Sequence, residues 1–279
     1  MWIRKTEIQQ LSGDIRKIID GQTIDLRDNA EGAWGALKND IHSLANIKNE
    51  RAAALKRERD TMSETLANIS HQLKTPLTSM MIMADLLENA PQNTQAEFIA
   101  NIKLGLTRME WLASALLKMA KLDAGIVAFA KENVPAQELA EQALAPLQVL
   151  LDLKQQTVHI NCETQITCDR RWTVEALTNL IKNASDHSPQ GGKICIESGA
   201  NPICKWVLVR DSGKGIPVAQ IPNLFKRFKA SQSESGYGIG LPLALAIMRG
   251  QGGDIDVDDG GKQNCGAVLT LKFFSMAPT

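Results

Sequence analysis

Aromatic side chains, an excess of charge of one sign and long apolar runs are all scarce in this sequence. Aromatic residues make up only 4% of it, which leaves few side chains on which nucleic-acid bases could stack. Lys plus Arg number 31 and so do Asp plus Glu, so the basic excess typical of nucleic-acid binding is missing. No stretch approaches the roughly 18 apolar residues that a membrane helix needs. We therefore expect no direct contact with nucleic acid and no bilayer span within this chain.

The cysteines form neither a metal-binding nor a disulfide pattern. Their number is odd, and no two are spaced as C-x-x-C. A zinc site needs clustered ligands, which this sequence does not offer. We expect buried, reduced thiols at all five positions, which are Cys162, Cys168, Cys195, Cys204 and Cys265.

Glycine is almost absent from residues 36–123, and this stretch reads with helical period. From Leu55 to Leu87 apolar residues recur mostly at alternating steps of three and four, like a coiled-coil seam. A polar turn at 89–95 leads to a second helix, which Gly125 can end. Two such helices form little core alone, so we expect a homodimer in which two hairpins make a four-helix bundle.

After residue 128 helical and alternating segments follow one another. Their order is helix, strand, helix, two strands, loop, helix and two strands, which predicts an α+β sandwich with helices over one face of a sheet. Residues 1–35 predict two short helices around a connector. The expected domains are an N-terminal segment with a linker helix at 1–50, a helical hairpin at 51–126 and a sandwich at 127–279.

The stretch "NLIKNASDHS" places Asn179 and Asn183 one turn apart on one helix face. Carboxamide oxygens are hard donors that suit Mg²⁺, which prefers oxygen ligands and phosphate partners. Two helical asparagines by themselves are usually surface residues, so the neighbouring motifs decide their meaning.

Two glycine-containing motifs follow. In "RDSGKGIP" Asp211 ends a strand, where its carboxylate can accept a hydrogen bond from an exocyclic amine beside Gly213 and Gly215. In "SESGYGIGLPLA" alternate glycines precede a helix whose N-terminus can face a phosphate. The second motif is not a Walker A loop, because no G-K-[ST] follows, and no β-α-β unit makes it a dinucleotide fingerprint.

The segment between these motifs is polar, basic and rich in serine, apart from Phe225 and Phe228. This composition predicts a lid that closes over a nucleotide and brings Lys226, Arg227 or Lys229 to its phosphates.

The motifs N-L-x-x-N-A, D-x-G-x-G-I-P, L-F-x-R-F and G-x-G-x-G-L, in this order, resemble the nucleotide-binding boxes of sensor histidine kinases. "SHQLKTPLT" upstream resembles the phosphoacceptor box of the same family. The resemblance covers residues 55–274, and "IIDGQTIDLRDNAEGAWGAL" more loosely resembles a HAMP-type relay. It implies a multidomain fold, in which an all-α hairpin dimerises into a four-helix bundle and precedes a GHKL-type ATP-binding sandwich.

The resemblance implies that His71 is the phosphoacceptor, in the context H-x-x-[KR]-T-P that includes Lys74. It also implies that Thr75 orients water in a phosphatase reaction. Pro76 removes a backbone donor and predicts a bend in this helix. Gln72 departs from the family, in which Glu or Asp often follows the histidine as a base.

For the nucleotide, the resemblance implies ATP with Mg²⁺, the metal being held by Asn183 with support from Asn179. The residues that it places around the nucleotide are Asn179, Lys182, Asn183, His187, Asp211, Gly213, Gly215, Ile216, Arg227, Lys229, Gly236, Tyr237, Gly238, Gly240 and Leu241. Asp186 and Ala230 stand where the family often has basic residues.

The family further implies autophosphorylation of His71 and transfer to an aspartate of a response regulator. It implies a cytoplasmic chain whose parent is anchored in the membrane through an N-terminal segment absent here. Two alternatives stay open: a conformational ATPase of the same ATP-binding fold, and a phosphatase-only or nucleotide-sensing dimer scaffold.

Overall fold

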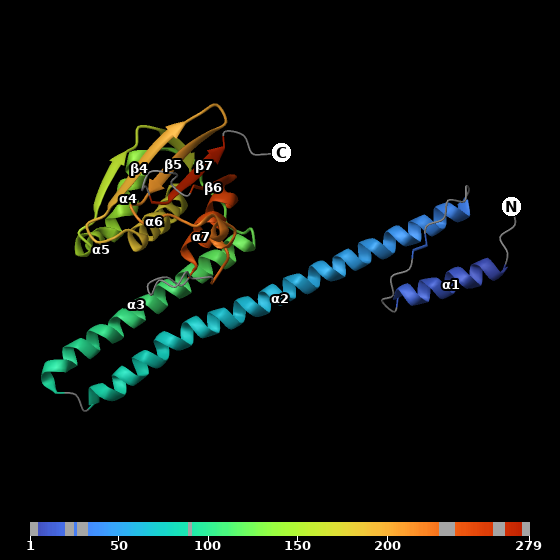
Figure 1. The fold of residues 1–279 in the computed structure, drawn as a ribbon, viewed down its shortest axis with the longest axis horizontal. Helices are drawn as coiled ribbons and strands as arrows, with labels where there is room; N and C mark the ends of the chain where they lie inside the picture. The colour runs from blue at the N-terminus through green and yellow to red at the C-terminus, as the bar shows by residue number, and fades with distance from the viewer. Residues whose placement is uncertain are drawn as a thin grey trace. The chain divides into compact units, whose positions relative to one another are not determined.

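The computed structural model describes residues 5–19, 25–26, 33–88, 91–228, 238–258 and 266–274 (Figure 1). The chain forms two compact units, Met1–Ala67 and Asn68–Thr279. Helix α2 (Ala33–Glu88) crosses the boundary between them, and each unit is described by itself.

The first unit has a small apolar core built from α1 (Lys5–Ile19) and the start of α2. Leu11, Ile18 and Leu26 are buried there, and Trp34 packs against them. Of the two short helices expected within residues 1–35, α1 is the first, and most of the stretch expected for the second lies outside the described residues. Residues 33–35 belong to α2, which begins at Ala33 and runs on to Glu88.

The second unit opens with a helical hairpin. Helix α2 continues through Pro76 to Glu88, and α3 (Gln92–Asp123) follows it. The two helices meet closely where Gly105 faces Met80, since a Cβ on residue 105 would lie 2.6 Å from the Met80 sulfur. Gly125, with φ +64, follows the end of α3. In the described parts of the chain, no helix combines the length and the apolar character of a bilayer span.

A five-stranded sheet forms the body of the second unit. Its strand order is β2-β4-β5-β7-β6; β2 and β4 are parallel, and the other pairs are antiparallel. Alternate residues along the strands are buried, so one face of the sheet is covered, as is common in largely antiparallel sheets. The strands are β2 (Thr157–Asn161), β4 (Lys193–Ala200), β5 (Cys204–Arg210), β6 (Gly253–Asp258) and β7 (Val268–Phe274).

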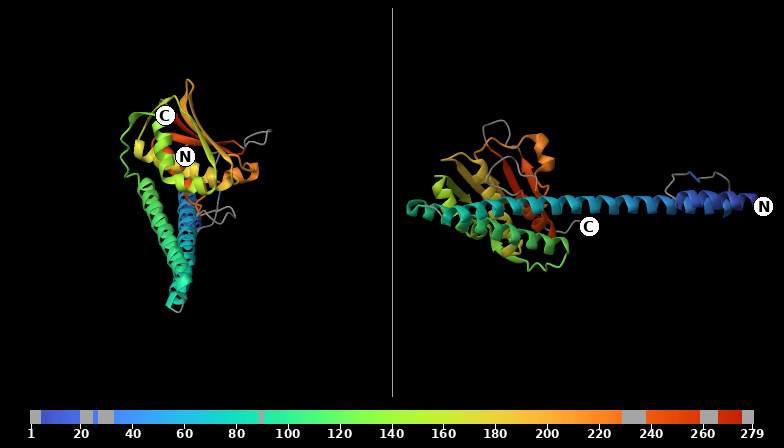
Figure 2. Two further views of the ribbon diagram at one scale, coloured as in Figure 1. Left: turned by 90° about the vertical axis from the view of Figure 1, so that its left-hand side faces the viewer. Right: turned by 90° about the horizontal axis from the view of Figure 1, so that it is seen from below.

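Helices α4 (Ala136–Leu144), α6 (Arg170–His187) and α7 (Gly240–Gly250) pack as a layer on this buried face (Figures 1 and 2). Fully buried leucine and isoleucine side chains of α6 and α7 meet those of the central strands. Leu112, Ala115 and Met119 of α3 belong to the same core, so α3 packs directly on this layer.

Two local features differ from the expectation. Strands β1 (Glu132–Pro135) and β3 (Gln165–Cys168) form a separate antiparallel pair, too short for periodicity to reveal. The helical stretch at 136–153 is divided into α4, the 3₁₀ turn η1 (Ala145–Leu147) and α5 (Gln148–Leu153). The break falls at Pro146, which lacks the backbone donor of a continuous helix.

All described cysteines are free thiols, and three of them are buried. Burial raises the pKa of both Cys162 and Cys168, which favours their protonated form. This agrees with buried thiols at those two positions.

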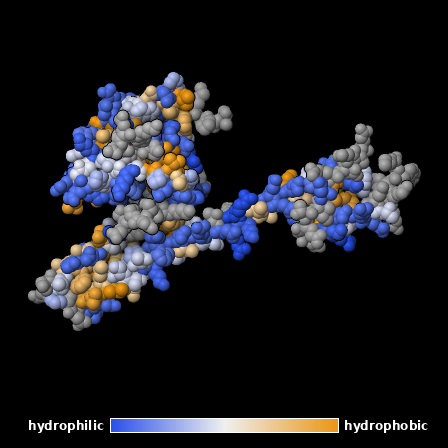
Figure 3. Space-filling model, viewed as in Figure 1, coloured by the Kyte–Doolittle hydropathy of each residue, from blue (hydrophilic) through white to orange (hydrophobic). Residues whose placement is uncertain are grey.

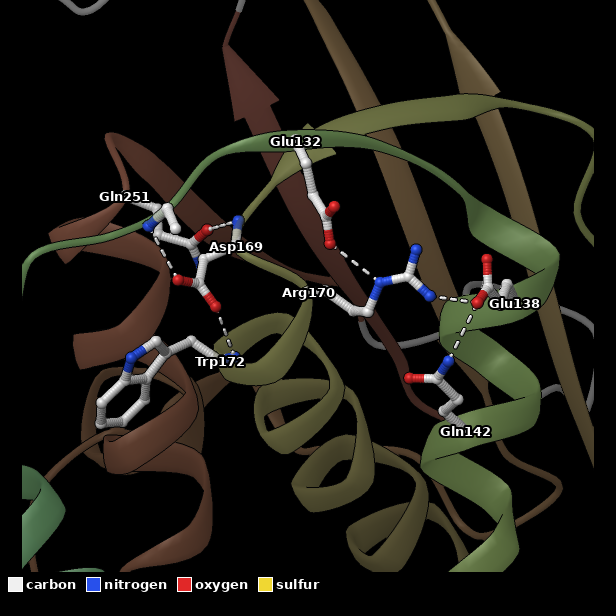
Figure 4. Close-up of polar contacts among 8 residues, drawn as sticks. Glu132, Glu138, Gln142, Asp169, Arg170, Trp172 and Gln251 are labelled. Atoms are coloured by element: carbon white, nitrogen blue, oxygen red, sulfur yellow. Dashed lines mark hydrogen bonds and ion pairs between the residues drawn. The ribbon is translucent and has the colours of Figure 1, made fainter.

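Asp169 joins three segments at the start of α6 (Figure 4). Its Oδ1 accepts a hydrogen bond from the Trp172 amide at 3.1 Å and so caps the helix, while its Oδ2 accepts one from the Ala130 amide at 2.9 Å. Its own amide donates to the buried Gln251 side chain at 2.7 Å. Asp169 thus ties the segment after the hairpin, the start of α6 and the end of α7 together.

Arg170 makes a second set of contacts beside this cap (Figure 4). Its guanidinium contacts the carboxylates of Glu132 in β1 and Glu138 in α4. Gln142 donates to the same Glu138 carboxylate at 3.1 Å. These exposed pairs orient β1 and α4 around the first turn of α6.

We expect Asp169→Ala to lower the free energy of unfolding by about 1–2 kcal/mol, because it removes the N-cap and leaves the Ala130 amide without its acceptor. Asp169→Asn is the comparison: asparagine caps helices about as well as aspartate, but its single oxygen cannot also accept from the Ala130 amide, so a smaller loss is expected. Urea unfolding of both variants measures the difference. Equal losses in the two variants would contradict a capping role.

Candidate active site

The C-terminal half of α6 carries both asparagines of the first motif. Asn179 is buried, and its Nδ2 donates to the Glu175 carbonyl at 2.9 Å. Its Oδ1 faces the first residue of α7, because a Cβ on Gly240 would lie 2.9 Å from that oxygen. Asn183 lies one turn further along and is half-buried. The fold therefore brings the asparagine motif against the last glycine of the glycine loop.

A buried side chain that sequence reasoning missed holds the end of α6. Gln156 donates from Nε2 to the carbonyls of Ser185, Ser188 and Pro189, at 3.0, 3.2 and 3.2 Å. Its Oε1 accepts from the Ser185 hydroxyl at 2.7 Å. These bonds satisfy carbonyls that the last turn of a helix leaves without partners. A single glutamine before a strand has no local pattern that could have revealed this role.

The unusual Asp186 has a partner. Lys154 Nζ lies 2.9 Å from its carboxylate and also donates to the Ser185 carbonyl at 3.0 Å. A lysine at the C-terminal end of a helix also complements the helix dipole. The acidic residue at 186 is therefore part of the contacts that hold the end of α6.

Asp211 lies at the end of β5 and is only 5% exposed. Its Oδ1 accepts hydrogen bonds from the amides of Gly213 at 2.8 Å and Ala267 at 3.0 Å. Burial raises the pKa of this carboxyl, and the two amides and the nearby His187 partly offset the rise. The result is a buried acceptor held in one orientation.

Two glycines make room around Asp211. A Cβ on Gly213 would lie 2.4 Å from the His187 carbonyl oxygen, and one on Gly266 would lie 1.8 Å from Asp211 Oδ1. His187 itself is exposed at the end of α6. Sequence reasoning found Gly213 but missed Gly266, because one glycine before a strand is too common to signal a site.

The glycine loop is described only at its end. Gly215 and Gly238 have φ of +73 and +65, a backbone conformation that residues other than glycine rarely adopt. Phe228 also has a positive φ, of 59. Its amide donates to the Gly238 carbonyl at 3.0 Å, so the segment that carries Arg227 meets the start of α7. Ile216 is half-buried and Leu241 is buried in the core. Lys229, Gly236 and Tyr237 lie outside the described residues.

Two of the described candidates for a phosphate-binding cation, Lys182 and Arg227, contact the hairpin. The Lys182 ammonium lies 4.8 Å from the centre of the Trp111 ring. The Arg227 guanidinium makes a bidentate ion pair with Asp123, at 2.8 and 2.7 Å. Sequence reasoning predicted neither contact.

The predicted phosphoacceptor lies on α2. His71 is exposed, as are Lys74 and Thr75, whereas Gln72 and Leu73 are half-buried. The Thr75 hydroxyl donates to the His71 carbonyl at 3.2 Å. The imidazole is therefore accessible from solvent, and the hydroxyl one turn later is bonded to the backbone of the same residue.

Two family models match this chain. Residues 61–125 match the His Kinase A (phospho-acceptor) domain, and residues 168–275 match the histidine kinase-, DNA gyrase B- and HSP90-like ATPase. The chain belongs to the sensor histidine kinases. The ATPase match also supports ATP binding by the second of these domains.

Among relatives of this chain, the heme sensor protein HssS of Staphylococcus saprophyticus is 27% identical over 87% of the chain. The chain spans 53% of the length of HssS. A structure of histidine kinase ThkA in complex with response regulator protein TrrA has a TM-score of 0.64 at 19% identity, covering 82% of this chain and 66% of ThkA. Full-length ShkA in complex with AMPPNP has a TM-score of 0.56 at 23% identity, covering 77% and 47%. These structural likenesses show the fold.

The comparisons confirm the family and the fold class that the sequence predicts, a helical hairpin followed by an ATPase-type sandwich. The domain boundaries and the roles of single residues stay predictions.

We expect Asp211→Asn to raise the stability of the chain at neutral pH. The folded chain binds the Asp211 proton more tightly than the unfolded chain, so ionisation costs stability as pH rises through the raised pKa. Below the ordinary Asp pKa of about 4, the difference between variant and parent should vanish.

Asp256→Asn is the control of opposite sign. A hydrogen bond from Lys272 lowers the pKa of Asp256, so the ionised carboxylate stabilises the folded chain. Replacing it with asparagine should therefore destabilise the chain at neutral pH and have no effect in acid, where the carboxyl is protonated. Urea midpoints at both pH values measure each effect. A stability loss in Asp211→Asn at neutral pH would overturn the expectation.

Proposed function

We propose that the chain catalyses ATP-dependent phosphorylation of His71 and passes the phosphoryl group to an aspartate of a response regulator. The observation that carries this proposal is an exposed histidine on a hairpin that shares one compact unit with an ATPase-type domain. In the first step a ring nitrogen of His71 attacks the γ-phosphorus in line with the leaving ADP. A nitrogen–phosphorus bond forms as the bond to the β–γ bridging oxygen breaks.

The base of ATP would lie against Asp211. The fixed carboxylate would accept a hydrogen bond from the exocyclic amine of adenine, and Gly213, Gly215 and Ile216 would border the ring. His187 would lie at the rim of this side. The close approach of Gly266 to Asp211 supports a carboxylate that cannot turn away.

The phosphates would lie toward the start of α7. Gly238 and Gly240 would let its backbone amides face them, and Leu241 would anchor that turn in the core. The residues on α6 fit a magnesium site, because both asparagines present hard oxygen donors on one face and Asn179 already donates its Nδ2 elsewhere. Asn183 and Asn179 would hold Mg²⁺, whose charge offsets that of the triphosphate. Lys182 and Arg227 would supply further positive charge.

The proposed homodimer would form through the hairpin. Large apolar side chains are exposed along both helices, and Figure 3 shows hydrophobic surface toward the hairpin end. Exposed apolar surface of this kind marks an interface. The residues are Leu77, Met81, Ile82, Leu86, Ile99, Leu104, Leu106 and Leu117.

A response regulator would dock on the hairpin around His71. The similar structure of ThkA is a complex with a response regulator protein, TrrA, which supports a partner of this class. Thr75 would orient water in dephosphorylation of that regulator. Gln72 can hydrogen-bond the imidazole but cannot take its proton, so another base would be needed in the forward reaction. The parent protein would be anchored in a membrane through a segment that is not part of this chain.

With γ-labelled ATP and Mg²⁺, we expect the chain to acquire a label that is acid-labile and base-stable, as a phosphoimidazole is. His71→Gln should acquire none, whereas His159→Gln, a change at another exposed histidine, should label normally. A chain that binds ATP yet takes no label would refute the kinase proposal and favour a phosphatase-only or ATPase reading.

We expect Thr75→Ala to lose at least about tenfold in phosphatase rate while its labelling rate stays within about twofold, because its hydroxyl would orient the water that attacks the phosphorylated aspartate and has no part in the attack of His71 on ATP. Thr78→Ala, at an exposed threonine on the same helix, is the control. The substrate is a phosphorylated regulator that accepts phosphoryl groups from this chain. An unchanged phosphatase rate would eliminate the role of Thr75.

A further inference from the structure

Helix α3 contacts the ATP-binding domain through three polar pairs besides its apolar core. Asp123 pairs with Arg227, and Trp111 lies under the Lys182 ammonium. Lys118 forms a third pair with Glu175 of α6, at 2.8 Å.

The apolar part of the same interface holds α3 in register. Leu122 lies close to the last residue of α7, since a Cβ on Gly250 would lie 3.6 Å from its side chain. Leu112, Ala115 and Met119 are buried below it. The polar pairs therefore belong to a packed face, in which each partner has a defined neighbour.

Two of the three pairs engage the described cations that the proposed function assigns to phosphates. A bidentate pair uses both terminal nitrogens of the Arg227 guanidinium and offsets its charge with a carboxylate. The aromatic face of Trp111 similarly attracts the Lys182 ammonium. In the proposed function a triphosphate would bind the same Arg227 guanidinium and the same Lys182 ammonium, so it would compete with α3 for them.

The backbone brings Arg227 to the relevant end of the domain. The neighbouring Phe228 bonds to Gly238, and Gly240 after it packs against Asn179. Lys182 lies beside Asn183 on α6. The two cations thus flank the asparagines and the start of α7, where the phosphates are proposed to lie.

We propose that α3 is a competing partner for the phosphate-binding cations: Asp123 and Trp111 hold Arg227 and Lys182 in the nucleotide-free chain, and binding of a nucleoside triphosphate draws these cations away and loosens the contact between α3 and the ATP-binding domain. This inference rests on the proposed function. By linkage, the pairs that weaken ATP binding are weakened by ATP to the same extent. The nucleotide thereby loosens the domain that must carry its γ-phosphate to a histidine.

The test compares Asp123→Asn with the parent chain and with Glu97→Gln, which removes an exposed carboxylate elsewhere on α3. Binding of ATP with Mg²⁺ and of AMP is measured by calorimetry on the full chain. We expect Asp123→Asn to bind ATP about two- to fivefold more tightly, the range expected for an exposed ion pair. AMP, which lacks the β- and γ-phosphates, should bind all three chains equally.

Hydrogen exchange supplies a second readout on the parent chain. ATP with Mg²⁺ should speed amide exchange in residues 111–123, and AMP should not. Three results would overturn the competition. Asp123→Asn and Glu97→Gln could bind ATP with equal affinity, Asp123→Asn could gain as much affinity for AMP as for ATP, or ATP could protect the amides of residues 111–123. Failure of the parent chain to bind ATP at all would instead overturn the proposed function, and this inference with it.

Discussion

Two buried polar side chains hold the opposite ends of α6, and the candidate nucleotide site depends on them. Asp169 caps the first turn, and Gln156 binds the last carbonyls. Between them the apolar face of the helix packs into the core, so neither end can shift without exposing an unsatisfied group. Asn179 and Asn183 are positioned because the helix that carries them is fixed at both ends.

The same rigidity extends to the adenine side of the site. Gln156 binds Ser188, whose hydroxyl accepts from the Ser212 amide at 3.3 Å. Ser212 follows Asp211, and the Asp211 carboxylate is held by the amides of Gly213 and Ala267. One connected set of hydrogen bonds therefore sets the spacing between the asparagine face and the buried carboxylate. A nucleotide bound in the proposed way would depend on this fixed spacing, because a loose arrangement would cost it orientation.

The hairpin presents a different physical situation. Its stripe of apolar residues is only partly covered by the ATP-binding domain, through Leu112, Ala115 and Met119, while many large side chains remain exposed. The polar pairs at the edge of this contact are individually weak, because they are exposed to solvent. A contact of moderate strength fits the proposal that nucleotide binding loosens the domain from the hairpin.

Much of the site could be predicted from the sequence, since its chemistry is written in short motifs. The spacing of Asn179 and Asn183, the strand-end Asp211 and the helical His71 are local patterns, and the structure places each on the expected element. Helical and strand periodicity likewise predicted the fold class. The pairing of β1 with β3, the break at Pro146 and the close approach of Gly266 were missed, because each depends on few residues or on distant partners.

The sequence by itself determined which groups could do chemistry, because side-chain type and helical or strand period are properties of neighbouring residues. Only the tertiary structure decided what those groups touch. Asp123 and Arg227 lie 104 residues apart, and no local pattern relates them. Packing of α3 on the helical layer brings them together, as it brings Trp111 to Lys182. The free energy that places such pairs comes from burial of the whole interface, which no single motif encodes.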